Sequence, residues 1–131
     1  MSAPRLEIDL DKIQHNAQTL VDRLATRGIS VTAVMKATLG SPEIAGALLR
    51  AGVSGLADSR IENIEAMRRA RVPAPMTLIR SPMLSQVERV VVHADVSFNT
   101  ELEVISKLSS AAFSSSMRGS SVFGFDAQKK K

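Results

Sequence analysis

The polar and apolar positions of this chain follow two periods in turn, that of a helix and that of a strand. After Asp9, apolar residues recur at spacings of four, three and four up to Leu24, and Gly28 follows where a helix-ending glycine belongs. A short β-favouring run over residues 29–35 then ends at Lys36. The pattern therefore predicts a helix that begins after Asp9 and a strand that ends just before Lys36.

The same alternation of helix and strand patterns continues to about residue 108. Ser41 and Pro42 form a helix N-cap followed by proline at the first helical position. Two S/T-x-x-E capping boxes, Ser59–Glu62 and Thr100–Glu103, predict further helix starts, and we expect the second of these helices to run through Leu108. The other predicted strands are Gly55–Asp58, Met76–Ile79 and Asp95–Asn99, and the other predicted helix covers residues 82–92.

The order of elements, one helix and then four strand–helix pairs, predicts the fold class. Strands that alternate with helices of this length form parallel β/α units with right-handed crossovers. The repeat of about 20–25 residues is that of a (β/α)8 barrel or of a doubly wound sheet. A complete barrel needs roughly 200–250 residues, and this chain has 131. Its four predicted strands would therefore make half of a barrel.

The C-terminal end departs from this pattern. From Ser109 the sequence reads SSAAFSSSMRGSSVFGFDAQKKK, in which neither period survives. We expect residues 1–110 to form the domain and residues 111–131 to be a serine-rich, basic tail, either disordered or unrelated to the domain.

Charge and composition exclude several classes of partner. The net charge is +4, but residues 113–131 contribute four basic groups and one acidic group, which leaves 13 basic and 12 acidic groups in the body. A near-neutral body with 3% aromatic residues is not the pattern of a nucleic-acid binder. The chain has no cysteine, no long apolar run and no signal-like start, so we expect a cytoplasmic protein without a membrane segment.

Lys36 is the first candidate for chemistry. It ends an apolar strand, and catalytic groups of parallel β/α folds collect at the carboxyl ends of strands. By alternation, Thr32, Val34 and Lys36 share a face that we expect to point inward. A buried amine is a good nucleophile for Schiff-base formation. The alternative is a lysine that reaches from the strand end into solvent.

Three further residues lie at or just beyond the ends of the next three predicted strands: Arg60, Arg80 and Asn99. The guanidinium fork of arginine suits a substrate carboxylate. The alternatives are a solvent-facing position in the first helical turn for Arg60, a merely exposed or structural position for Arg80, and a cap or loop role for Asn99. His15 and His93 have no partners at metal-ligand spacing, and we assign no metal site.

The segments around Lys36 resemble a known family. IDLDKIQHNAQTL followed by VTAVMKATLG resembles the start of the alanine racemase-like family of enzymes that use pyridoxal 5'-phosphate (PLP). The continuation SPEIAGALLRAGVSGLADSRIENIEAMR, then MTLIRSPM and DVSFNTELEVIS, is most similar to the ornithine/alanine racemase branch. The resemblance covers about residues 5–110, in order.

The resemblance implies that the chain is the N-terminal half of a PLP-binding TIM-type barrel. It also implies that Lys36 holds PLP as an aldimine and serves as one of two bases that interconvert L- and D-amino acids. The second base, the phosphate-binding loops and the partner of the pyridine nitrogen lie outside the segments that match. Alanine racemases have a tyrosine after the lysine. Here the loop is Ala37–Gly40 and the chain has no tyrosine, as in the ornithine-like branch.

Two other functions stay open at this point, a non-catalytic PLP-binding or PLP-homeostasis protein and a small α/β interaction domain. A family pattern that breaks off after the fourth strand suggests a truncated chain. Half a barrel leaves two sheet edges open. We therefore expect the chain to form a homo-oligomer or to associate with a full-length relative, and to be inactive or incomplete by itself.

Overall fold

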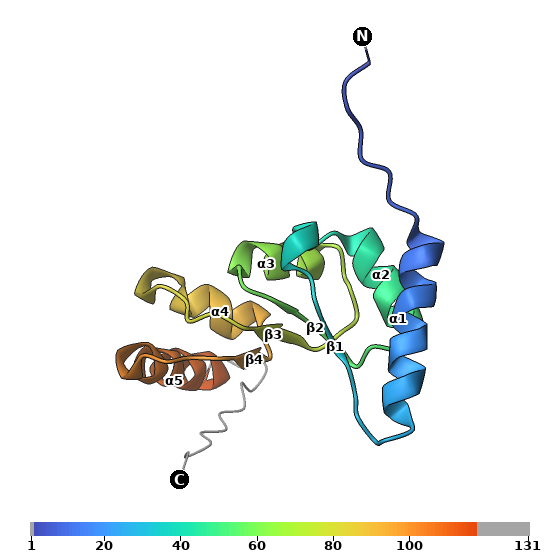
Figure 1. Ribbon diagram of the computed structural model, residues 1–131. Helices are drawn as coiled ribbons and strands as arrows, with labels where there is room; N and C mark the ends of the chain where they lie inside the picture. The colour runs from blue at the N-terminus through green and yellow to red at the C-terminus, as the bar shows by residue number, and fades with distance from the viewer. Residues whose placement is uncertain (1, 118–131) are drawn as a thin grey trace.

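The computed structural model describes residues 2–117, which form a single parallel sheet with helices between its strands (Figure 1). The strands lie in the order of the sequence: β1 (Thr32–Val34), β2 (Gly55–Asp58), β3 (Met76–Leu78) and β4 (Val96–Ser97). The helices are α1 (Leu10–Ala25), α2 (Pro42–Arg50), α3 (Ile61–Arg69), α4 (Val87–His93) and α5 (Leu102–Met117), with short 3₁₀ turns η1 (Lys36–Thr38) and η2 (Leu84–Gln86). The predicted order of parallel β/α units is confirmed.

The starts of the first two helices follow the sequence signals. The Asp9 carboxylate accepts hydrogen bonds from the backbone amides of Asp11 (3.1 Å) and Lys12 (3.2 Å) and so caps α1. Ser41 caps α2 by accepting a hydrogen bond from an amide of its first turn, and proline fills the first helical position. Gly28 lies just after α1 with a positive φ of 70°, a conformation that costs glycine little.

The two predicted capping boxes are wrong. Helix α3 begins one residue later than the first box requires, with Arg60 at the N-cap position and no side-chain cap hydrogen bond from it. The Arg60 amide instead donates to the Asp58 carboxylate at the end of β2 (2.9 Å). The Thr100 amide donates to the Ser81 hydroxyl (3.0 Å) rather than closing a box with Glu103, and α5 starts after Glu101. In both loops a contact outside the helix replaces the local cap.

Helix α5 is longer than predicted. It continues through the serine-rich segment as far as Met117, beyond the expected end at Leu108. Its buried positions recur at spacings of four, three and four: Val104, Leu108, Ala111 and Ser115. Serine is only modestly less favourable than alanine in a helix, and it is small enough to pack at a close helix contact. The expected tail over residues 111–131 is thus helical in its first part, and residues 118–131 lie outside the described residues.

The two faces of the sheet differ in their environment. Strand register pairs Ala33 with Leu56 and Leu56 with Met76, so these side chains share one face. On that face Leu56, Met76 and Leu78 are fully buried or nearly so under the helices (Figure 1). The opposite face is largely open within residues 2–117: Ala57 in its middle is buried, but Val34, Val96 and Phe98 are 49%, 44% and 58% exposed. None of the described helices is both long and apolar enough to cross a bilayer.

Arg68 connects four elements at the amino edge of the sheet. Its guanidinium donates to the carbonyl of His93 (2.9 Å), to the carbonyl of Ala74 (3.2 Å) and to the Asp95 carboxylate (2.7 Å). The same Asp95 oxygen accepts the Met76 amide (2.7 Å). Helix α3 is thereby joined to the end of α4 and to the starts of β3 and β4.

A second polar contact joins α3 to α4. The Arg89 guanidinium donates to both carboxylate oxygens of Glu65, at 2.7 and 2.6 Å. The Glu65 side chain is 14% exposed, so this fork is shielded from solvent on the carboxylate side. The hydrogen bonds from Arg89 lower the pKa of Glu65, and burial opposes them in part.

This contact predicts an acid-dependent loss of stability. Because the pKa of Glu65 is lower in the folded chain than its ordinary value of 4.5, the contact stabilises the fold above pH 4.5 and is lost as the pH falls through the lower folded value. In urea unfolding, Glu65→Gln should be less stable than wild type near pH 7, and the difference should vanish at low pH. Glu88→Gln, at an exposed position on α4, should show no such pH-dependent difference. An equal Glu65→Gln effect at pH 7 and pH 3 would contradict the assignment.

Candidate active site at the carboxyl edge of the sheet

Lys36 lies directly after the last hydrogen bond of β1. The Met35 amide still donates to the carbonyl of Ala57 on β2 (2.7 Å), and Lys36 then begins the η1 turn. Its position at the carboxyl edge agrees with the sequence prediction. The expectation of a buried lysine is wrong, because Lys36 is exposed and the neighbouring open face of the sheet is not covered within the described residues.

The loop after Lys36 closes on a single carbonyl group. The Met35 oxygen accepts hydrogen bonds from the Thr38 amide (3.0 Å), the Thr38 hydroxyl (2.9 Å) and the Gly40 amide (3.3 Å). Leu39, between them, has a left-handed backbone with φ of 54°, which is costly for a residue with a side chain. Three donors on one acceptor thus hold Lys36 at the base of a tight turn.

Gly40 allows this loop to pack closely on α3. Its φ is +67°, and a Cβ atom placed there would lie 2.8 Å from the Asn63 carbonyl oxygen and 3.0 Å from the Asn63 Cβ. Only a residue without a side chain allows this approach. The loop that carries Lys36 therefore packs directly on the first turn of the helix that follows the next strand.

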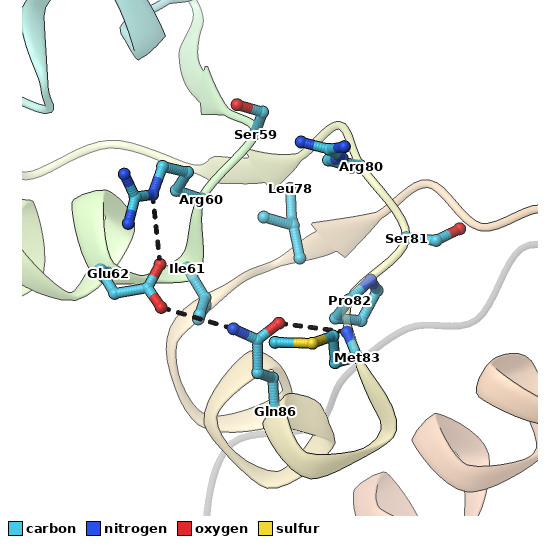
Figure 2. A pocket seen from close by; sticks show the side chains of 10 residues that line it. All are labelled: Ser59, Arg60, Ile61, Glu62, Leu78, Arg80, Ser81, Pro82, Met83 and Gln86. Carbon is cyan, nitrogen blue, oxygen red and sulfur yellow. Dashed lines mark hydrogen bonds and ion pairs between the residues drawn. The ribbon is translucent and has the colours of Figure 1, made fainter.

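Arg60 and Arg80 line one cavity of about 470 Å³ between the loops that follow β2 and β3. In Figure 2, Arg60, Glu62 and Gln86 are linked along one wall, and Arg80 lies across the cavity from them. The Arg60 guanidinium is 3.8 Å from the Glu62 carboxylate, which also accepts a hydrogen bond from the Gln86 amide group (3.4 Å). The structure thus brings these two predicted residues to the same cavity.

Arg80 also lines a second cavity, of about 410 Å³, together with Asn99. The Asn99 side-chain amide donates to the carbonyl (3.0 Å) and to the hydroxyl (3.1 Å) of Ser97. Its donor group is therefore engaged within its own loop, which is the alternative role considered from the sequence. The Ser81 hydroxyl, accepting the Thr100 amide (3.0 Å), holds the two loops of this cavity together.

Asp58 lies at the centre of this edge, and its strand-end position alone left its role ambiguous between a site residue and a structural one. Asp58 is fully buried, and its Oδ1 atom accepts the Arg60 amide (2.9 Å) and the Asn63 side-chain amide (3.1 Å). Its Oδ2 atom has no hydrogen-bond partner among the described residues. The spacing D-S-R-I-E-N, an aspartate at a strand end with an asparagine five residues later, was the available signal.

Comparison with known proteins identifies the family. Residues 8–119 match the family described as alanine racemase, N-terminal domain. The chain belongs to this family. The match includes Lys36, all four strands and the loops that follow them.

Two curated relatives in this family are racemases. The chain is 38% identical over 108 residues to a lysine racemase of Thermotoga maritima, and 36% identical over 110 residues to an ornithine racemase of Acetoanaerobium sticklandii. These alignments cover 82% and 83% of the chain but 30% of each relative. The chain thus spans about a third of the length of the curated relatives it matches.

Solved structures give the same fold. A D-threonine aldolase from Filomicrobium marinum superposes with a TM-score of 0.77 at 20% identity, covering 92% of this chain and 33% of that one. An alanine racemase from E. faecalis gives a TM-score of 0.68 at 25% identity, covering 77% and 28%. With the family assignment, these matches confirm the predicted fold class, the N-terminal part of a PLP-binding TIM-type barrel.

Substitutions of two glycines test whether the Lys36 loop packs on α3. Gly40→Ala places a Cβ against Asn63 and should destabilise the fold, whereas Gly28→Ala has a similar φ of +70° and nothing within 4 Å of its Cβ. Both variants carry the left-handed backbone cost of about 1–2 kcal/mol, and Gly40→Ala adds a steric cost of about 1–3 kcal/mol. Chemical unfolding of both variants measures the difference. Equal losses would show that the loop does not pack on α3 as described.

Proposed function

We propose that this chain supplies the lysine-bearing part of a PLP-dependent amino-acid racemase that interconverts L- and D-amino acids. The observation that carries the proposal is Lys36, an exposed primary amine at the carboxyl edge of β1, inside the segment that matches the family. The named activities of the two curated relatives, lysine and ornithine racemisation, favour a diamino acid as the substrate class.

The residues at this edge fit PLP in one essential respect. The cofactor carbonyl reacts with a primary amine, and Lys36 offers one that solvent reaches. When bound, PLP supplies an electron sink that makes loss of the substrate α-proton possible. In the proposed site the Lys36 Nζ would hold the cofactor, and it would take or return the α-proton on one side of the substrate Cα. We assign no second base and no phosphate ligands to this chain.

Arg80 is the residue that we propose for the substrate carboxylate. It lines both cavities at the carboxyl edge, and among the described residues it forms no ion pair within 4.0 Å, whereas Arg60 is 3.8 Å from the Glu62 carboxylate. A guanidinium free to make a bidentate contact suits a carboxylate. Arg60 is a secondary candidate. Asn99 lines the cavity but is not proposed as a substrate ligand, because its side-chain amide already donates to the Ser97 carbonyl.

The two alternative functions have less support. A non-catalytic PLP-binding protein would use the same lysine, and an interaction domain would not need it. The curated relatives at 36–38% identity are named as racemases, which favours the catalytic function. A racemisation assay separates it from PLP binding alone.

Covalent trapping tests the role of Lys36. After incubation with PLP and borohydride, mass spectrometry of peptides should find the cofactor on Lys36, because the proposal assigns PLP to this amine, which follows the carboxyl end of β1. Lys107, exposed on α5, is an internal control for reaction at any accessible amine. Lys36→Ala should abolish the specific adduct while leaving the background at Lys107. Equal labelling of Lys36 and Lys107 would contradict the proposal.

The open side of the sheet predicts association. Within the described residues β1 and β4 are edge strands, and Val34, Val96 and Phe98 are exposed on the uncovered face. Open edges and apolar faces drive self-association. We propose that the chain forms a homo-oligomer or binds a full-length relative, and that alone it does not racemise amino acids.

Light scattering after size-exclusion chromatography, beside a racemisation assay with PLP and lysine, ornithine or alanine, tests this proposal. Phe98→Ser should reduce association because it removes apolar surface from the open face. Phe113→Ser, at a position 69% exposed on α5, is the matched control and should leave association unchanged. A stable monomer that racemises any of the three amino acids would overturn the proposal.

A further inference from the structure

Asp58 is the one fully buried charged side chain among the described residues. A buried carboxylate is costly unless hydrogen bonds compensate it, and here only one of its two oxygens has partners. An apolar side chain of similar size would avoid the unpaired Oδ2 atom, but it would leave the Arg60 amide and the Asn63 side-chain amide without this acceptor. The role of Asp58 in the fold therefore lies in the two groups that it binds, the Arg60 amide and the Asn63 side chain.

The partners of Asp58 belong to the first turn of α3. The Arg60 amide occupies the N-cap position of this helix, and Asn63 lies in its first turn. Arg60 itself provides no side-chain cap, and Asp58, at the end of β2, binds the backbone of this N-cap residue instead. Both contacts fix the start of α3 relative to the strand that precedes it.

The start of α3 is also the surface on which the Lys36 loop rests. Gly40 packs against the carbonyl oxygen and Cβ of Asn63 so closely that no Cβ fits at Gly40. The other end of the same loop is fixed at the Met35 carbonyl. One buried carboxylate on β2 is therefore linked through Asn63 and Gly40 to the backbone of the loop that carries Lys36 after β1.

We propose that Asp58 and Asn63 are positioning residues for Lys36. They hold the first turn of α3 in place, this turn supports Gly40, and the support fixes the position of Lys36 at the carboxyl edge. Asp58 fixes the Arg60 backbone through the same oxygen, so it aligns two neighbouring loops of the site. This inference rests on the proposed PLP-binding role of Lys36, and its effect on the loop can be measured without the cofactor.

The first measurement is hydrogen exchange of the Thr38 and Gly40 amides, both of which donate to Met35. Asn63→Ala removes the contact with Asp58 but keeps the Cβ, and it should speed this exchange about tenfold. Asn63→Asp places two carboxylates together and should speed it further. Glu65→Ala is the matched control, since it removes a contact of α3 with α4 and should leave the exchange of these two amides unchanged.

The second measurement is borohydride trapping of PLP on Lys36 relative to Lys107 in the same sample. Displacement of the lysine should lower this ratio about tenfold in Asn63→Ala, with no change in Glu65→Ala. Circular dichroism checks that each variant keeps its helix content. If Asn63→Ala loses helix, Asp58→Val takes its place, because it keeps a similar volume, removes the acceptor of both hydrogen bonds and should change both readouts in the same direction.

The outcomes separate the two proposals. Unchanged exchange in Asn63→Ala would overturn the link between Asp58 and the Lys36 loop. Faster exchange with an unchanged trapping ratio would show that the loop loosens without moving Lys36, which overturns its positioning. If wild-type Lys36 is not trapped while exchange still responds to Asn63→Ala, the proposed function fails and the effect of the pair on the loop stands.

Discussion

The structure depends on the burial of one face of a short parallel sheet. The strands contain only two to four residues each, so few backbone hydrogen bonds hold them together. The side chains that share the buried face, among them Leu56, Met76 and Leu78, provide the apolar contact that holds the helices against the sheet. Because side chains alternate between the two faces of a strand, its register determines the face on which each side chain lies. Fixing these residues inward therefore directs Val34, Thr77 and Phe98 to the other face.

The two edges of this sheet serve different purposes. At the amino edge, Arg68 and Asp95 join helices and strands through hydrogen bonds that are all directed at protein groups. At the carboxyl edge the loops leave space, with two cavities and exposed cations at Lys36 and Arg80. This division is expected of parallel β/α folds, in which the amino edge stabilises and the carboxyl edge binds. The hydrogen bonds at the amino edge are therefore separate from the loops that line the two cavities.

Periodicity and helix-start signals were enough to predict every strand and the order of the helices. They succeeded where the determining contacts are local, as at the Asp9 cap or the Ser41–Pro42 start. They failed where a side chain outside the predicted capping box binds the backbone at the start of the helix. Asp58 binds the Arg60 amide two residues later, and Ser81 binds the Thr100 amide from another loop. Only the second pairing has no signal in the local sequence. The length of α5 was missed for a related reason, because the small residues that pack it have little hydrophobic signal.

The candidate site shows the same limit more sharply. Strand-end position was sufficient to select Lys36, Arg60 and Arg80, since parallel strands bring their carboxyl ends to one edge. The contact of Gly40 with Asn63, which holds the Lys36 loop, could not be predicted, because these residues are 23 positions apart in the sequence and meet only in the fold. The fold does not choose the reaction either, since a D-threonine aldolase and an alanine racemase share it. A shared fold does not determine the position of each reactive group. In this chain we propose that the contacts of Asp58 with Asn63, and of Asn63 with Gly40, determine the position of Lys36.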